Sequence, residues 1–505
     1  MRTMNARLRF GMAAALAFGA AACNETVEPL VLAGAPAAMV TLTGDAQVGA
    51  VGTALAAPFV VRVADAAGAP VPGVFVEWTT TGGTLSQATD TTDAGGQAST
   101  ILTLPAGSGT VTVTAHVDGL SDVTFTATAS PIGSLLTFRY VDAGAYHACG
   151  ITTTEQAVCW GFSDDGQTGT GIFARVTPPT LVVGPLGATR ITAGGRYHSC
   201  GTTLAGVIYC WGANQDGRLG NKGQDPSAIP QQLRSPFTFR SVVAGLTHSC
   251  AIDLTRDVWC WGNNADGELG SITEHTHADT AVFVGGPYRT VAAGGLHTCA
   301  VTPTGDMDCW GYNQSGQLGS AAPLRNFAPV PVSGGFTFLT EPATIPQAPD
   351  PDFYIPGQAF ITAGYAHTCG ITGANTAVCW GENENGQLGR GNLVDSNTPV
   401  SVAGGLSFKA ITAGYKHTCA LNMVGAAYCW GNNELGQLGD GTVTGHDAPV
   451  PVSGGLAFQS ISAGETFTCG VTTAGTAYCW GDNVYGQLGQ PGPGSLVPVK
   501  LPFQP

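Results

Sequence analysis

The chain has 505 residues, of which 44% are hydrophobic and only 10% are charged, and its formal net charge at pH 7 is −15. This length allows roughly two to four domains, and so few charges exclude a solvated disordered chain. The 34 acidic against 19 basic residues argue against a nucleic-acid partner, because phosphates are bound by Lys and Arg. The 73 glycines, together with many Val, Thr and Ala residues, predict an all-β chain rich in turns.

Residues 1–22 have the layout of an export signal. Arginines precede a short apolar run, FGMAAALAF (10–18), which is too short to span a bilayer, and small residues then lead to Cys23. The segment resembles a bacterial lipoprotein signal, although Ala20 stands where that family usually has a large aliphatic residue. The resemblance implies lipidation of Cys23 and a tether over residues 23–35. An ordinary secretory signal that is cut near Cys23 is the alternative.

A cysteine-free segment, residues 36–130, alternates apolar and polar residues between Gly and Pro turns, as in FVVRVADAAGAPVPGVFVEW (59–78). Short strands at this spacing predict a β-sandwich. The pattern V-x-D-x-x-G-x-P-V-x-G-V-x-V-x-W, followed by T-D-A-G-G-x-A, resembles the bacterial immunoglobulin-like repeats of invasin and intimin. The resemblance implies an Ig-like spacer with Trp78 in its core, since such modules mostly hold a binding head away from the membrane.

Fourteen of the 15 cysteines follow residue 148 and form pairs that are always ten positions apart, although successive pairs are 49 to 70 positions apart. A β-hairpin that folds about the midpoint of each pair would place its two Cys side chains opposite each other, about 4.5–5.5 Å apart at Cβ. Zinc is the competing interpretation, but zinc sites prefer C-x₂₋₄-C spacing, and disulfides persist outside the cytoplasm. The expected disulfides are Cys149 with Cys159, Cys200 with Cys210, Cys250 with Cys260, Cys299 with Cys309, Cys369 with Cys379, Cys419 with Cys429 and Cys469 with Cys479.

The cysteine pairs belong to a unit that occurs seven times: A-G-x-x-H-[TSA]-C, nine residues, C-W-G, then G-Q-L-G and a Pro-Val segment. Residues 413–439, AGYKHTCALNMVGAAYCWGNNELGQLG, show its main part complete. Each unit predicts four short strands, with prolines on the outer edge. Seven such units predict a seven-bladed β-propeller over residues 131–505. Whether the blades are offset from the repeats by one strand stays open at this point.

These motifs resemble the regulator of chromosome condensation repeat over about residues 137–505. The resemblance implies a seven-bladed propeller. The family includes the eukaryotic nucleotide-exchange factor for Ran and a secreted bacterial β-lactamase inhibitor. Its eukaryotic members lack this cysteine pattern, so the disulfides indicate an adaptation to export.

Residues that recur in every unit are expected to be structural. A Trp follows the second Cys of all seven units, and a His precedes the first Cys of six units, with Phe467 in the seventh. A catalytic or metal-binding His would occur once or in a cluster. The loops after Trp-Gly are rich in Asn and Asp, which suit tight turns. Calcium ligation is the alternative for these loops, but GYNQSGQLG (311–319) has no carboxylate.

The segment 339–358, between the fourth and fifth units, is the exceptional insert. It contains five prolines, and its centre carries the candidate partner-binding residues Asp350, Asp352, Phe353 and Tyr354. A stiff exposed loop on a rigid scaffold suits a partner contact. The alternative is that this segment is an insertion without a function.

The sequence therefore predicts an all-β protein with an immunoglobulin-like β-sandwich before a seven-bladed propeller. The leading functional hypothesis is a monomeric, non-enzymatic binding or adhesion protein at the bacterial cell surface. It would bind a protein or glycan and touch the membrane only through its lipid anchor. A secreted or periplasmic enzyme inhibitor is the alternative, and nucleotide exchange rests on family analogy only. No catalytic motif stands out, and we expect no metal and no cofactor.

Overall fold

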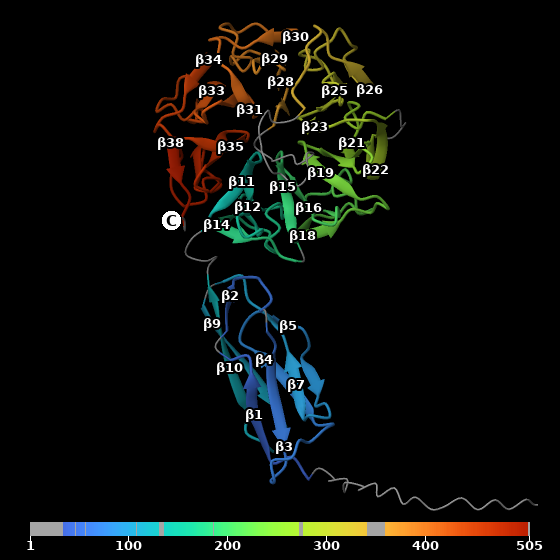
Figure 1. Ribbon diagram of the computed structural model, residues 1–505, viewed down its shortest axis with the longest axis vertical. Coiled ribbons are helices and arrows are strands. Elements are labelled where there is room, and N and C mark those ends of the chain that lie inside the picture. Colours follow the sequence, from blue (N-terminus) through green and yellow to red (C-terminus); the bar gives the residue numbers. More distant parts are fainter. Residues whose placement is uncertain are drawn as a thin grey trace, which may run out of the picture.

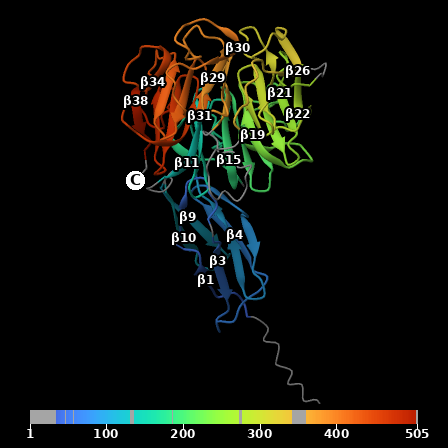
Figure 2. The same ribbon diagram turned by 45° about the horizontal axis from the view of Figure 1, so that its top comes forward.

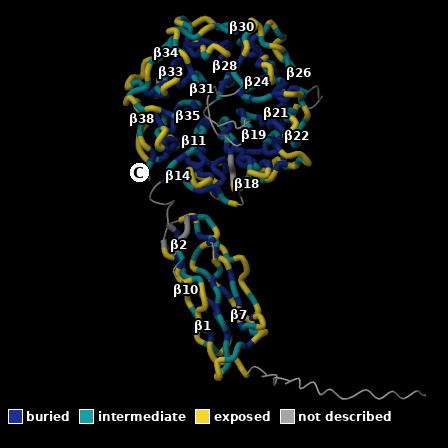
Figure 3. The backbone as a smooth tube through the Cα atoms, viewed as in Figure 1, coloured by how far each residue is buried: buried dark blue, intermediate teal, exposed yellow. Residues whose placement is uncertain are grey.

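The computed structural model describes residues 34–45, 47–55, 57–107, 109–130, 136–184, 186–271, 276–340 and 359–502. They form two all-β bodies, a small sandwich and a ring of blades (Figure 1). Buried residues lie between the two sheets of the sandwich and within and between the blades, whereas many of the outer loops are exposed (Figure 3). In these ranges there is no helix that is long and apolar enough to cross a membrane.

The first body is the predicted β-sandwich. A three-stranded sheet has the order β1-β3-β7, a five-stranded sheet has the order β2-β10-β9-β4-β6, and β5 pairs with β8. The rings of Phe59 and Trp78 pack against Phe125 between the sheets, at centroid distances of 5.0 and 6.0 Å, so Trp78 is a core residue as predicted. The strands are β1 (Ala38–Thr43), β2 (Gln47–Ala50), β3 (Phe59–Ala64), β4 (Phe75–Thr80), β5 (Thr84–Leu85), β6 (Thr89–Thr91), β7 (Gln97–Thr100), β8 (Leu102–Thr103), β9 (Gly109–His116) and β10 (Val123–Ser130).

The second body is the predicted seven-bladed propeller, seen obliquely in Figure 2. Each blade is a four-stranded antiparallel sheet whose strands follow one another in sequence. The innermost strands are β11 (Phe138–Ala143), β15 (Ala188–Gly194), β19 (Phe239–Ala244), β23 (Thr290–Ala293), β27 (Ile361–Ala363), β31 (Phe408–Ala413) and β35 (Phe458–Ala463). The second strands are β12 (His147–Thr152), β16 (His198–Thr203), β20 (His248–Asp253), β24 (His297–Val301), β28 (His367–Ile371), β32 (His417–Asn422) and β36 (Phe467–Thr472).

The two outer strands of each blade carry the remaining repeat motifs. The third strand holds Cys-Trp-Gly. The fourth strand is the outer edge, and it carries the predicted prolines in six blades but none in the third blade, where it is HADTAVFVG. The third strands are β13 (Ala157–Gly161), β17 (Ile208–Gly212), β21 (Val258–Asn263), β25 (Met307–Tyr312), β29 (Ala377–Gly381), β33 (Ala427–Gly431) and β37 (Ala477–Gly481). The fourth strands are β14 (Val176–Leu181), β18 (Ser227–Gln232), β22 (His277–Gly285), β26 (Arg325–Pro331), β30 (Ser396–Ser401), β34 (His446–Pro451) and β38 (Ser495–Lys500).

The second and third strands of every blade form the hairpin that the cysteine spacing predicts. In the sixth blade Cys419 lies directly opposite Cys429 in the strand register, and a disulfide joins them. All seven pairs are joined in this way, with Cα–Cα distances of 4.0–4.1 Å. The cysteines are buried and pack against the Trp of the following blade, as Cys419 and Cys429 do against Trp480. Each disulfide therefore lies within one blade and contributes to the core between two blades.

The repeated Trp joins neighbouring blades, which confirms its structural role. The indole Nε1 of Trp480 donates a hydrogen bond to the carbonyl of Gln437 in the preceding blade at 3.0 Å. The equivalent bond occurs in every blade, with distances of 2.8–3.0 Å. A Cβ on Gly439, the last residue of G-Q-L-G, would lie 2.6 Å from this Nε1. The motif needs Gly there because the indole packs directly on the backbone.

The repeated His also joins blades. Thr468 donates its hydroxyl to the Gln437 carbonyl at 2.8 Å and therefore accepts a hydrogen bond from Nε2 of His417 at 2.9 Å. Burial lowers the pKa of His417 to about 3, so the ring is neutral. Six blades have such a His–hydroxyl pair. At the seventh junction Phe467 packs with Ala148, so both polar partners are replaced by apolar ones.

This seventh junction closes the ring between the last and first blades. Among the described residues no strand is exchanged between these two blades, so blades and repeats are not offset. The backbone N–H of Glu465 donates to the Gly144 carbonyl at 3.2 Å. The N–H of Ala143 donates to Ser462 Oγ at 3.0 Å, and Trp160 Nε1 donates to the carbonyl of Gln487 at 2.9 Å. Closure is therefore non-covalent and uses the contacts that join the other blades.

Candidate functional site

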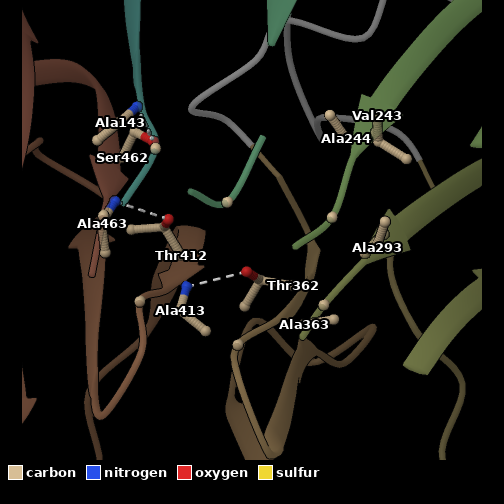
Figure 4. A pocket seen from close by; sticks show the side chains of 18 of the residues that line it. Ala143, Val243, Ala244, Ala293, Thr362, Ala363, Thr412, Ala413, Ser462 and Ala463 are labelled. Atoms are coloured by element: carbon tan, nitrogen blue, oxygen red, sulfur yellow. Dashed lines mark hydrogen bonds between the residues drawn. The ribbon is translucent and has the colours of Figure 1, made fainter. Parts of the chain in front are cut away.

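A cavity of about 180 Å³, which we call the channel, lies at the centre of the ring. Its wall is the end of each innermost strand, where the Ala-Gly of the repeat lies (Figure 4). Small side chains at this position keep the channel open. The wall alanines are Ala143, Ala193, Ala244, Ala293, Ala363, Ala413 and Ala463.

The glycine that follows each wall alanine is required by the contact between blades. A Cβ on Gly464 would lie 2.2 Å from the carbonyl oxygen of Gly144, and a Cβ on Gly414 would lie equally close to the carbonyl oxygen of Gly464. Such distances are too short for any side chain, so the recurrence of this Gly reflects packing.

The channel has a polar side and an apolar side. Thr362, Thr412 and Ser462 each accept a hydrogen bond from the wall-alanine N–H of the next blade, at 2.9–3.1 Å. Val243 and Ala293 lie across the channel (Figure 4). The repeat therefore keeps its backbone contacts while the chemistry of the wall varies from blade to blade.

Asp142 stands at the equivalent position in the first blade. Its Oδ1 accepts a hydrogen bond from Ser462 Oγ at 2.8 Å, and its Oδ2 accepts one from the Ala193 N–H at 2.9 Å. Solvent in the channel reaches part of this side chain, yet protein surrounds it. Desolvation therefore raises the pKa of Asp142, although the hydrogen bonds from Ser462 and Ala193 oppose the rise.

The mouth of the channel, at the end where the first strands turn into the second, carries a cluster of charged and aromatic side chains. Arg196 lies in the turn of the second blade, AGGRYH, which is one residue longer than the turns of the other blades. It donates two hydrogen bonds to Glu465 of the seventh blade, at 2.9 and 2.6 Å. The Tyr146 hydroxyl of the first blade donates to the same carboxylate at 3.1 Å. We call these three residues the mouth clamp, because they join blades seven, one and two.

Aromatic rings surround the clamp. The guanidinium of Arg196 lies 5.1 Å from the ring centroid of Tyr146, and Tyr485 lies 4.9 Å from that ring. Tyr365 and Tyr415 stack on each other at 4.1 Å. Desolvation raises the pKa of Tyr146 and of Tyr415 to about 12, so both hydroxyls stay protonated. Partly exposed tyrosines next to a guanidinium suit recognition of a partner, because they offer apolar area and hydrogen bonds with little loss of side-chain entropy.

Two blades depart from the Gln of G-Q-L-G. The residue is Arg218 in the second blade and Glu268 in the third, and both are buried. Oε2 of Glu268 accepts a hydrogen bond from the Asp266 N–H at 2.9 Å, as Gln317 Oε1 does from the Ser315 N–H in the next blade. Oε1 of Glu268 has no partner among the described residues. Desolvation raises the pKa of this carboxyl to about 7.

The residues that the sequence singled out for partner binding, Asp350, Asp352, Phe353 and Tyr354, lie outside the described residues, as does Cys23. They stay predictions. The structure instead brings together the mouth residues, which sequence reasoning missed. Two signals pointed to them: the extra residue in the second A-G-x-x-H turn, and the replacement of His by Phe467 at the ring junction.

Comparisons with known families match the two bodies separately. Residues 186–504 match the RCC1-like domain, residues 138–167 match the regulator of chromosome condensation (RCC1) repeat, and residues 40–130 match the bacterial Ig-like domain (group 1). These matches confirm the resemblances predicted for residues 36–130 and for the propeller.

Similar proteins share parts of the propeller. The probable E3 ubiquitin-protein ligase HERC4 of Rattus norvegicus is 36% identical over 98 residues, which are 19% of this chain and 9% of that protein. The protein RCC2 homolog of Danio rerio is 37% identical over 87 residues, 17% of each chain. The chain thus covers less than a fifth of either relative.

A similar solved structure is yeast RCC1 (Prp20) bound to Kap60. It has 20% sequence identity and a TM-score of 0.57, and the match covers 73% of this chain and 85% of that one. At this identity the likeness shows the propeller fold and nothing finer.

Proposed function

Since this chain belongs to the family of the RCC1-like domain, we propose that it is a non-enzymatic binding protein whose propeller binds a partner at the mouth of its channel. The Ig-like domain would act as a spacer at the bacterial cell surface, so that the propeller is presented to a protein or glycan. The observation that carries the proposal is the mouth clamp with its surrounding tyrosines. These side chains come from five different blades and meet at one partly exposed place.

The repeated side chains support a binding role over a catalytic one. The six repeat histidines are buried and bonded to hydroxyl groups of neighbouring blades. Burial lowers the pKa of His147 and of His417 to about 3, far below the range that suits a general base at neutral pH. The variable side chains on this rigid frame lie at the mouth, and loops on rigid scaffolds commonly carry recognition.

The test is capture of envelope proteins and glycans by the full chain without its export signal, compared with the variant Tyr365→Ala/Tyr415→Ala. The matched control is Leu204→Ala, because Leu204 is 80% exposed in the turn between β16 and β17, at the opposite end of the strands. We expect the tyrosine variant to lose its ligand and the control to keep it. Equal capture by all three proteins would place binding away from the mouth.

The nature of the captured molecule separates the finer alternatives. A glycan or matrix protein that binds whole cells through the mouth supports adhesion. A one-to-one complex that blocks the activity of a captured enzyme indicates inhibition instead.

A further inference from the structure

The charge of Asp142 is a feature of the channel that the repeat does not explain. At the equivalent positions Thr362, Thr412 and Ser462 accept the same hydrogen bond from the next blade with a neutral hydroxyl. Asp142 does this too, to Ala193. A neutral hydroxyl is therefore enough for this contact, and Val243 and Ala292 stand at the equivalent position of blades three and four without any side-chain acceptor, so joining the blades does not require a negative charge.

No cation in the described residues forms an ion pair with Asp142. Its hydrogen-bond donors are all neutral: the hydroxyls of Ser462 and Thr192 and the backbone N–H groups of Ala193 and Ala143. The guanidinium at the mouth, Arg196, is held by Glu465. Asp142 also lines the cavity, and solvent there reaches part of the residue. An unpaired charge in such surroundings is unfavourable until a cation meets it.

The cavity has room for such a cation with a short apolar chain. A cavity of about 150 Å³ is enough to hold benzene, and this one measures about 180 Å³. Across the channel the wall consists of Val243, Ala244 and Ala293, which offer apolar contact but no hydrogen bond from their side chains (Figure 4). The two sides together match a group that is cationic at one end and aliphatic along its length.

We propose that the central channel binds a primary ammonium group on a short aliphatic chain, with the ammonium on Asp142 and the chain against Val243, Ala244 and Ala293. A free alkylamine and the lysine side chain of a partner share this chemistry. The inference goes beyond the proposed function, because the channel can take an ammonium group whether or not the mouth binds a macromolecule.

The test is isothermal titration of the full chain without its export signal with n-butylammonium chloride, and with 1-butanol as a neutral probe of equal length. We expect n-butylammonium to bind with a dissociation constant at about the millimolar level and 1-butanol to bind at least tenfold more weakly. Equal binding of the two probes, or no binding of n-butylammonium, overturns the proposal.

Two variants locate the site. Asp142→Asn keeps the size of the side chain and an acceptor but removes its charge, and we expect at least tenfold weaker n-butylammonium binding. Ala293→Leu fills the channel from the opposite side without touching Asp142, so it tests the site even where the first variant does not fold. Leu204→Ala is the control and should bind like the parent chain. Unchanged affinity in either folded channel variant overturns the assignment.

A lysine-containing tripeptide, Gly-Lys-Gly, separates the two sources of the ammonium group. Competition between the tripeptide and n-butylammonium supports insertion of a lysine side chain from a partner. Binding of n-butylammonium alone supports a free amine as the ligand. A failure to capture any macromolecule at the mouth leaves these titrations unaffected, so the two proposals fail separately.

Discussion

Replacing Glu268 by Gln should remove a pH-dependent loss of stability from the propeller. Glu268 occupies the position that Gln holds in five of the seven blades, and it is fully buried. One carboxylate oxygen accepts a hydrogen bond from the Asp266 N–H, while the other has no partner among the described residues. A buried, half-satisfied carboxylate is unfavourable when ionised, and an amide of the same size carries no charge.

The magnitude follows from the pKa. Desolvation raises the pKa of Glu268 from 4.5 to about 7. Because each pKa unit corresponds to about 1.4 kcal/mol, ionising this carboxyl costs about 3 kcal/mol more in the folded state than in the unfolded state. Between pH 4.5 and 7 the folded state therefore binds more protons than the unfolded state. Stability falls as pH rises through this window and levels off above it. Glu268→Gln should abolish that fall and be more stable than the parent chain by about 3 kcal/mol at pH 8.

Urea unfolding at pH 4.5, 6 and 8, with the disulfides intact, measures the effect. The reciprocal variant Gln317→Glu serves as the control, because Gln317 makes the same hydrogen bond in the next blade. Because this variant keeps Glu268 and gains a second buried carboxyl, its stability should fall more steeply with rising pH than that of the parent chain. Parallel pH profiles for the parent chain and Glu268→Gln, or a less stable Gln variant at pH 8, would refute the reasoning.

Three further predictions concern the blades and their junctions. Phe467→His alone should destabilise the ring by about 1–3 kcal/mol, because its imidazole would face Ala148 without a hydroxyl acceptor. In a double-mutant cycle, adding Ala148→Thr should restore most of the lost stability, and strictly additive effects of the two substitutions would contradict the pairing. Replacing Cys419 and Cys429 together by Ala should cost about 2–3 kcal/mol, and an unchanged melting temperature would contradict this estimate. Gly464→Ala should lower the melting temperature and make the ring junction sensitive to proteases, since the added Cβ would lie 2.2 Å from a backbone oxygen. A protease-resistant variant with an unchanged melting temperature would argue against tight packing at this junction.

The features that the sequence predicted correctly are those that local spacing determines. A constant separation of ten residues is enough to place Cys419 opposite Cys429, because both lie in one hairpin. The structural role of the repeated Trp and His also followed from the repeat. A side chain that recurs in nearly every blade serves a contact that occurs in nearly every blade.

The mouth was not predictable in the same way. Arg196 and Glu465 are 269 residues apart, and Tyr146 and Glu465 are 319 apart, and only closure of the ring brings them together. The sequence shows the extra residue beside Arg196, but it does not show which blade that turn faces across the ring. The hypothesis of partner binding by Asp350 and its neighbours came from composition, which shows an unusual segment without placing it on a surface.

The confinement of each disulfide to a single hairpin bears on how an exported chain would become oxidised. The two cysteines of each bridge are only ten residues apart, so in an exported chain each bridge could form before the next blade had been delivered. The fourteen blade cysteines then need no reshuffling between blades, because the partner nearest in the chain is always the native one. Covalent maturation can proceed one blade at a time, whereas closure of the ring, where Phe467 packs with Ala148, must wait for the last blade.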